Sequence, residues 1–347
     1  MARPGRSALC LIAALAMTGA APAQAASRLE APWPDPESLE GVAGQPVTFQ
    51  SSSPFTLTDV GPDQERDPPT TAEGTLFLPA KAASTARVPA VVLIHGAAGV
   101  QDARDLTYGR QLASLGIAAL SVDAFAARRD RASSFVERLI EITEAMLLAD
   151  VYGGLHYLAA RPDIDARHIA LVGFSYGGMV TLYAAQAMVA ERYAPDGLRF
   201  AGHAAFYAPC IARFDDKRAT GAPVLMLMGG KDQIVDKKRC AEVAGDLRAG
   251  GAEVDSVVYP EAMHQWDGAW PGPRRLGRNL ADCKFVVRRS GLVQDTFTFM
   301  PMLGPTTRKL ILAACADSEG YLLGRDDAVR AKSNRDLGRF LARVLAR

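Results

Sequence analysis

This sequence lacks an excess of charge of either sign: it has 39 Lys and Arg residues against 38 Asp and Glu residues in a chain of 347. Proteins that bind nucleic acid gather positive charge against the phosphates, so this balance argues against a nucleic-acid partner. The sequence also contains no CxxC pair and no Cys/His cluster, the usual ligand patterns for structural zinc. We therefore expect no metal site.

The N-terminus lacks an apolar run long enough to cross a membrane, because its apolar segment covers only Ala8–Ala16. Arg3 and Arg6 precede this segment, and Ala23-Gln24-Ala25 follows it with the small-x-small pattern of a secretory cleavage site. We predict that residues 1–25 are a signal peptide. The mature chain is then expected to be periplasmic or secreted, without stable membrane insertion. A buried helix or an uncleaved anchor is the alternative interpretation of this segment.

Cysteine is scarce, and removal of the signal peptide takes Cys10 with it. The even number that remains, in an oxidising compartment, predicts disulfide bonds. Four cysteines allow three pairings, and free buried thiols are the alternative. Their positions along the chain favour two bridges, Cys210–Cys240 and Cys283–Cys315.

Strand-like and helix-like segments alternate after residue 70, whereas residues 26–70 are rich in Pro, Ser, Asp and Glu and are expected to be an extended lead-in. Near-continuous apolar runs are typical of strands buried on both faces of a parallel sheet. Strands are expected at 74–79, 89–95, 117–122, 169–173, 200–207, 224–228 and 254–259, and helices around 108–115, 135–160, 178–190 and 237–247. This order predicts an α/β fold with a mostly parallel central sheet flanked by helices, forming a single domain over residues 26–347.

One segment, about residues 265–325, breaks this alternation. It contains a hairpin-like stretch at 284–299 and a second apolar run at 310–315. We predict an insertion with a small β element of its own, placed before a closing helix that starts at about Ser333.

The motif Gly173-Phe174-Ser175-Tyr176-Gly177 joins an expected strand to an expected helix. A sharp strand-to-helix turn leaves no room for a Cβ beside its apex and holds the apex residue in a strained conformation. The serine hydroxyl then projects above the carboxyl end of the sheet, where the helix N-terminus directs its N–H groups. Ser175 is therefore predicted to be a nucleophile.

A serine nucleophile needs a base and an acid that orients the base. On a sheet of this kind the expected chain order is serine, acid, histidine. His264 lies in the loop after the last apolar strand and is the predicted base, whereas His203 lies within a strand and precedes the acid. Asp232 follows the strand at 224–228 and is the predicted acid; Asp236, its competitor, is expected to start the next helix.

Two backbone N–H groups are predicted to stabilise the oxyanion. One belongs to Tyr176, directly after the nucleophile, and the other to Ala97, in the Gly-rich loop after the strand at 89–95. His95, in the same loop, is expected to support it structurally.

Trp266 and Trp270 follow the predicted base at the start of the insertion. They are candidate substrate-binding residues that could form an apolar wall at the rim of the site. Packing of the insertion onto the domain is the alternative role for both.

Four segments together resemble the dienelactone hydrolase branch of the α/β-hydrolases: Ile94-His95-Gly96, DIDARHIALVGFSYGG (163–178), MGGKDQIV (228–235) and YPEAMHQW (259–266). The resemblance covers roughly residues 74–266 and the closing helix. It implies an α/β-hydrolase sheet and a triad that falls here on Ser175, Asp232 and His264. The sequence departs from the family in having serine where the family carries cysteine, an export signal and the long insertion.

Together these features predict an exported serine hydrolase that cleaves a small-molecule carboxylic ester through an acyl-enzyme intermediate, without a cofactor. The serine in place of cysteine favours ester hydrolysis over the family's lactone substrate. A peptidase or amidase with the same triad, and a non-catalytic binding protein on a hydrolase scaffold, are the alternatives.

Overall fold

The computed structural model describes Met1 and residues 28–39, 41–80 and 87–346. Apart from Met1, the predicted signal peptide lies outside these residues. None of the helices within the described ranges is both long and apolar enough to cross a membrane.

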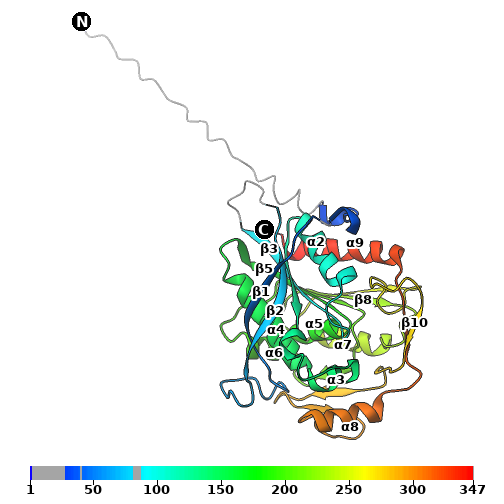
Figure 1. The fold of residues 1–347 in the computed structure, drawn as a ribbon. Helices are drawn as coiled ribbons and strands as arrows, with labels where there is room; N and C mark the ends of the chain where they lie inside the picture. Colours follow the sequence, from blue (N-terminus) through cyan, green and yellow to red (C-terminus); the bar gives the residue numbers. More distant parts are fainter. Residues whose placement is uncertain (2–27, 40, 81–86, 347) are drawn as a thin grey trace.

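Eight strands of the described residues form one sheet, in the order β1-β2-β4-β3-β5-β6-β8-β9 (Figure 1). β2 pairs antiparallel with β1 and β4, and every other neighbouring pair is parallel. The strands are β1 (Gln45–Ser52), β2 (Pro69–Phe77), β3 (Val88–Ile94), β4 (Ala118–Asp123), β5 (Ile164–Phe174), β6 (His203–Phe206), β8 (Val224–Gly229) and β9 (Val254–Tyr259). The predicted mostly parallel sheet is confirmed.

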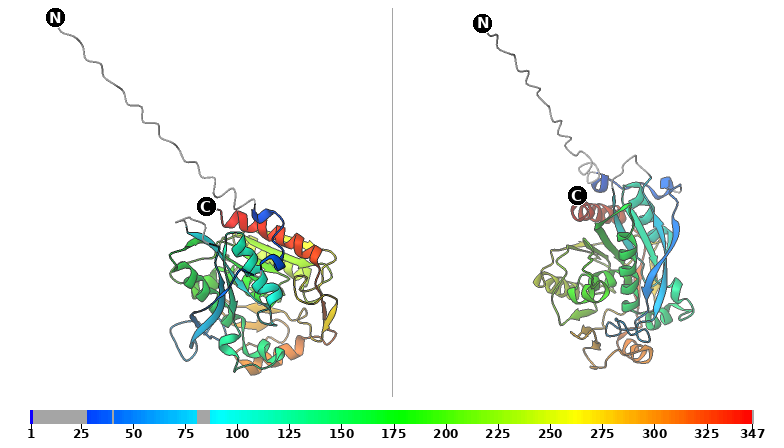
Figure 2. Two further views of the ribbon diagram at one scale, coloured as in Figure 1. Left: turned by 45° about the horizontal axis from the view of Figure 1, so that its top comes forward. Right: turned by 90° about the vertical axis from the view of Figure 1, so that its left-hand side faces the viewer.

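Helices cover both faces of this sheet. They are α2 (Thr107–Ser114), α4 (Glu144–Ala159), α5 (Tyr176–Ala184), α6 (Ala187–Tyr193), α7 (Lys237–Ala249) and α9 (Asp327–Val344). A further helix, α3 (Phe135–Glu141), buries none of its side chains fully. Side chains of α2 and α9 pack with alternate residues of β3 and β5 on one face, and side chains of α4, α5 and α6 pack with the intervening residues on the other. Figure 2 shows α9 (red) lying along the first of these faces. The continuous apolar runs of the central strands are thereby buried on both sides, as the sequence predicts.

The expected lead-in contains a strand that the sequence did not predict. β1 pairs with β2 from Gln45↔Leu76 to Ser52↔Pro69 and forms the edge of the sheet. Only Phe49 of this strand is fully buried, because one face and one edge of β1 are open to solvent. An edge strand of this kind carries little of the apolar signal by which strands are predicted.

Two expected helices are each divided in two. The expected helix at 135–160 is interrupted at Ile142, whose backbone is extended, so that α3 ends before α4 begins. The expected helix at 178–190 likewise forms α5 and α6, and the closing helix α9 begins at Asp327 rather than near Ser333.

The insertion contains the predicted hairpin, formed by β11 (Phe285–Val287) and β12 (Val293–Asp295). The hairpin is not independent of the domain, because β11 also pairs in parallel with β7 (Ala212–Phe214). The apolar run at 310–315 is helical and ends α8 (Pro305–Cys315), which packs beside α3 (Figure 1). A second small sheet joins β10 (Arg274–Leu276) to β13 (Tyr321–Leu323).

Both predicted disulfides, Cys210–Cys240 and Cys283–Cys315, are present. The first joins the segment after β6 to α7, and the second joins the start of the hairpin to the end of α8. The first bridge therefore links two segments outside the insertion, and the second links two parts of the insertion.

Candidate active site

Ser175 lies at the turn between β5 and α5 with φ of 54° and ψ of −111°. An L-residue with positive φ is strained, and the surrounding packing must maintain it. A Cβ at Gly173 would overlap the carbonyl oxygen of Gly177, and a Cβ at Gly177 would overlap that of Ile94. The two glycines of the motif are therefore required by contact, and the turn holds the serine in the strained geometry that the motif predicts.

The structure brings Ser175, His264 and Asp232 together from three separate loops. The Ser175 hydroxyl lies 2.8 Å from Nε2 of His264, and Nδ1 of His264 lies 2.7 Å from Oδ2 of Asp232. The second carboxylate oxygen of Asp232 accepts a 3.0 Å hydrogen bond from the backbone N–H of Ile234. The Asp232 and His264 side chains are fully buried, whereas Ser175 keeps 6% of its surface exposed. With Nδ1–H directed at the carboxylate, Nε2 is free to accept the serine proton.

Asp236, the competing acid, has a different role in the structure. Its carboxylate accepts hydrogen bonds from the backbone N–H groups of Lys238 and Arg239, at 3.0 and 3.1 Å. It therefore caps the N-terminus of α7.

Two tyrosines hold the imidazole of His264 in place. The ring centroids of Tyr207 and Tyr321 lie 4.8 and 5.1 Å from that of His264, both in edge-to-face geometry. Tyr207 has a positive φ of 39°, as does Gln265, at 56°, directly after the histidine. Of the four described non-glycine residues with positive φ, three lie at this site; the fourth is Phe299 in the insertion.

A buried polar network anchors Tyr207 and the end of the histidine loop. The Asp267 carboxylate accepts hydrogen bonds from the hydroxyls of Tyr207, at 2.6 Å, and Tyr108, at 3.2 Å. Burial raises the pKa of Asp267, although the nearby guanidinium groups of Arg104 and Arg330 act in the opposite direction. Burial, together with the charge of Asp267, also raises the pKa of Tyr207, which therefore stays a hydrogen-bond donor.

The sequence analysis did not identify Tyr207, Tyr321 or Asp267 as part of the site. Tyr207 directly follows β6 at the carboxyl edge of the sheet, a position that could have drawn attention to it. Tyr321 reaches the site from the far end of the insertion, for which the sequence carries no local signal.

The loop after β3 lies against the serine. A Cβ at Gly96 would lie 3.2 Å from Cβ of Ser175, so the backbone of Gly96, the residue before Ala97, passes directly beside the nucleophile. Nδ1 of His95 donates to the carbonyl oxygen of Gly96 (2.7 Å), and Nε2 accepts from the N–H of Ala124 (3.1 Å). Both ring nitrogens of His95 are thus occupied in holding the loop, which fits the predicted structural role.

The two candidate substrate-binding tryptophans lie in different surroundings. Trp266 is completely buried, packs against Tyr207 and Tyr259, and donates a 3.0 Å hydrogen bond to the hydroxyl of Ser333. Trp270 is 41% exposed and its ring is covered by the guanidinium of Arg274, at 4.2 Å. Of the two predicted roles, an apolar wall at the site or packing of the insertion, the surroundings of Trp266 favour packing.

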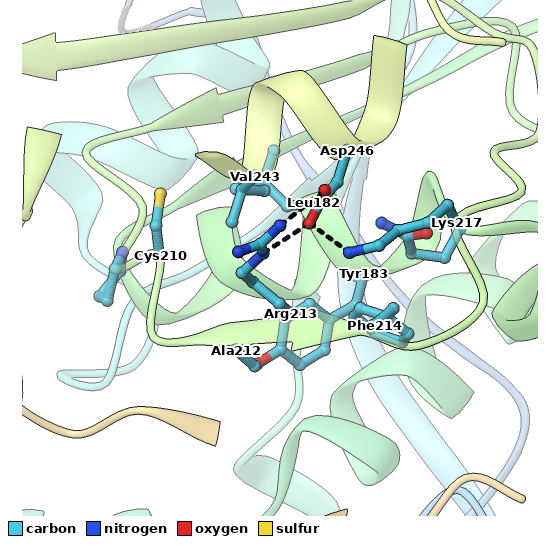
Figure 3. Close-up of a pocket in the computed structure, with 11 residues that line it drawn as sticks. Leu182, Tyr183, Cys210, Ala212, Arg213, Phe214, Lys217, Val243 and Asp246 are labelled. Atoms are coloured by element: carbon cyan, nitrogen blue, oxygen red, sulfur yellow. Dashed lines mark hydrogen bonds and ion pairs between the residues drawn. The ribbon is translucent and has the colours of Figure 1, made fainter. Parts of the chain in front are cut away.

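A cavity beside the Cys210–Cys240 bridge lies apart from these residues. Figure 3 shows Arg213 and Lys217 directed at the carboxylate of Asp246, which accepts their hydrogen bonds at 2.6 to 2.8 Å. The cavity volume of about 10 Å³ is enough for a single water molecule. These residues therefore tie α7 to the segment after β6 and do not form a substrate site.

Known proteins resemble the part of the chain that holds this site. The family model described as "Dienelactone hydrolase family" matches residues 73–268. The "Putative carboxymethylenebutenolidase" of Yersinia pestis is 27% identical over 191 residues, which are 53% of this chain and 70% of that protein.

Two solved structures are similar to the chain at lower identity. A dienelactone hydrolase-like promiscuous phosphotriesterase from metagenomic libraries is 20% identical, with a TM-score of 0.44, over 64% of this chain and 85% of the other. Thermogutta terrifontis esterase 2 is 15% identical, with a TM-score of 0.46, over 67% of this chain and 87% of the other. The family match spans more than half of the 347 residues, and the matched segment contains most strands of the central sheet. The chain therefore belongs to the dienelactone hydrolase family.

Proposed function

We propose that this member of a hydrolase family is an exported serine hydrolase that cleaves carboxylic esters. The observation that carries the proposal is the continuous hydrogen-bonded chain from Ser175 through His264 to Asp232, with its two short links of 2.8 and 2.7 Å. Serine in place of a thiol favours ester substrates, and the two disulfides fit an oxidising compartment.

The reaction follows from the geometry of these groups. Oγ of Ser175 attacks the ester carbonyl carbon while its proton passes to Nε2 of His264, and Asp232 stabilises the imidazolium that forms. The N–H groups of Tyr176 and Ala97 stabilise the oxyanion of the tetrahedral intermediate. When that intermediate collapses, the alcohol leaves with the proton from His264 and the acyl group stays on Ser175. Water then attacks the acyl-enzyme by the same steps, releasing the acid and restoring the serine.

Labelling with a fluorophosphonate, followed by assays on chromogenic esters of graded acyl length and on peptide substrates, tests this function. We expect the parent protein to be labelled at Ser175 and to hydrolyse esters faster than peptides. Ser175→Ala should lower kcat by several orders of magnitude at nearly unchanged melting temperature, because the triad acts as a unit. A Ser175→Ala variant that keeps more than about 5% of the parent kcat would show that another group is the nucleophile.

A further inference from the structure

The insertion reaches the residue next to the nucleophile through Arg308 of α8. The guanidinium forms a bidentate ion pair with Glu144, at 2.8 and 2.9 Å, and its Nε donates to the carbonyl oxygen of Leu139 at 2.7 Å. It also donates to the sulfur of Met302, at 3.2 Å, and to the hydroxyl of Tyr176, at 3.4 Å. Every N–H group of this buried guanidinium therefore has a partner, an arrangement that fixes its orientation.

The side chain of Tyr176 is held at its hydroxyl end by this arrangement. Its backbone N–H, the proposed oxyanion donor, is at the first residue of α5, and its hydroxyl donates to the carbonyl oxygen of Ile142 at 2.9 Å. The ring lies in the core with 5% of its surface exposed. The hydroxyl end of the side chain is thus fixed by Ile142 and Arg308, and the N–H beside Ser175 belongs to the same residue.

The end of the insertion contacts the other members of the site. His264 donates its backbone N–H to the carbonyl oxygen of Leu322 (3.3 Å), and its own carbonyl oxygen accepts the N–H of Gly324 (3.0 Å), so β13 pairs with the histidine loop. The N–H of Leu322 also donates to Oε1 of Gln233, the neighbour of Asp232, at 3.1 Å. One insertion thus contacts the nucleophile turn, the histidine loop and the acid loop.

These contacts differ from those of a mobile lid. Segments that open readily have few buried contacts and solvent-exposed hydrogen bonds. Arg308, in contrast, is 4% exposed, and the Cys283–Cys315 bridge ties the end of its helix to the hairpin. Burial alone would raise the pKa of Glu144, but the Arg308 charge and hydrogen bonds lower it below the ordinary value, so the pair is ionised. Removing one partner of a buried ion pair leaves the other charge buried without compensation. The groups that the Arg308 guanidinium contacts, the Tyr176 hydroxyl among them, would then lose their fixed partner.

We infer that the insertion is a fixed positioning element of the active site rather than a lid, and that Arg308 is a positioning residue that keeps the N–H of Tyr176 aimed at the oxyanion. The inference rests on the proposed serine hydrolase function.

The test compares Arg308→Met with Arg308→Lys and with a matched control, Arg213→Met, in the full disulfide-bonded protein. Arg213 also forms a bidentate pair with a carboxylate, that of Asp246 (Figure 3), and within the described part of the chain its side chain donates hydrogen bonds only to Asp246 and Glu242. For each variant we would measure the second-order rate of fluorophosphonate labelling, kcat and KM on p-nitrophenyl acetate per titrated active site, and the melting temperature.

Arg308→Met is expected to lower both the labelling rate and kcat at least about tenfold, while KM changes by less than about twofold. Arg308→Lys should recover part of this loss, since one ammonium can keep the charge but not the bidentate pair. Arg213→Met should lower the melting temperature and leave both rates within about twofold of the parent.

Equal rates in Arg308→Met, Arg213→Met and the parent would overturn the inference. If Arg308→Met does not fold, Glu144→Gln removes the same ion pair while keeping the side-chain shape, and the same criteria apply. Failure of the parent to be labelled would instead refute the proposed nucleophile, and the inference with it.

Discussion

Replacing Asp232 by asparagine changes one atom and should nearly abolish catalysis. In the structure one carboxylate oxygen accepts the N–H of Ile234 and the other accepts Nδ1–H of His264. An asparagine side chain has only one oxygen, so it can satisfy only one of these two donors. The other donor would face the amide NH₂ group.

The favoured arrangement keeps the amide oxygen on the fixed backbone N–H of Ile234. The NH₂ group then faces Nδ1 of His264, which must become the acceptor, so the ring proton moves to Nε2. A protonated Nε2 cannot take the proton of Ser175. Loss of the correct tautomer corresponds to a fall of about 10⁴ in kcat, or about 5.5 kcal/mol in the activation barrier.

The measurement is kcat for the hydrolysis of p-nitrophenyl acetate, and thermal unfolding followed by circular dichroism verifies that the variant is folded. Asp236→Asn is the matched control, because asparagine caps a helix about as well as aspartate and should leave kcat nearly unchanged. If Asp232→Asn keeps more than about 1% of the parent kcat, or if both variants lose activity equally, the tautomer argument is wrong.

Three further predictions follow from burial and connectivity. Trp266→Ala should lower the unfolding free energy by about 3–5 kcal/mol and reduce kcat/KM equally for short and long esters. Trp270→Ala should lower the unfolding free energy much less. A roughly tenfold change in the ratio of kcat/KM between short and long esters for Trp266→Ala would instead show that Trp266 determines specificity. Replacing Cys283 and Cys315 by serine opens a loop with a sequence separation of 32 and should cost about 3–4 kcal/mol in denaturant unfolding, while an unchanged midpoint would argue against this bridge. Burial lowers the pKa of His203 from 6.5 to about 4, so the folded state resists protonation and stability should be lost as pH falls from 6.5 to 4. The difference in pKa corresponds to a loss of about 3 kcal/mol in the unfolding free energy over this pH range. His203→Leu should therefore reduce the fall of the melting temperature between pH 6.5 and pH 4, and an equal fall in the variant and the parent would contradict the prediction.

The sequence predicted the central strands well because each is buried on both faces and therefore reads as one apolar run. β1 was not predicted, because it is an edge strand of the sheet in which only Phe49 is buried, so its sequence shows no apolar run. Trp266 was expected at a rim because it follows His264 in sequence. The positive φ of Gln265 redirects the chain between them, and the indole enters the core against Tyr207 and Tyr259.

The sequence by itself determined the order of the central strands, the strained turn at Ser175 and the chain order of serine, acid and histidine. These features are encoded within a few consecutive residues, by apolar periodicity and by glycines that leave room for close backbone contacts. Only the tertiary structure decided which groups support the site. Tyr207 and Asp267 are 60 residues apart, and Arg308 and Tyr176 are 132 residues apart, so their contacts exist only once the sheet has brought distant loops to one edge.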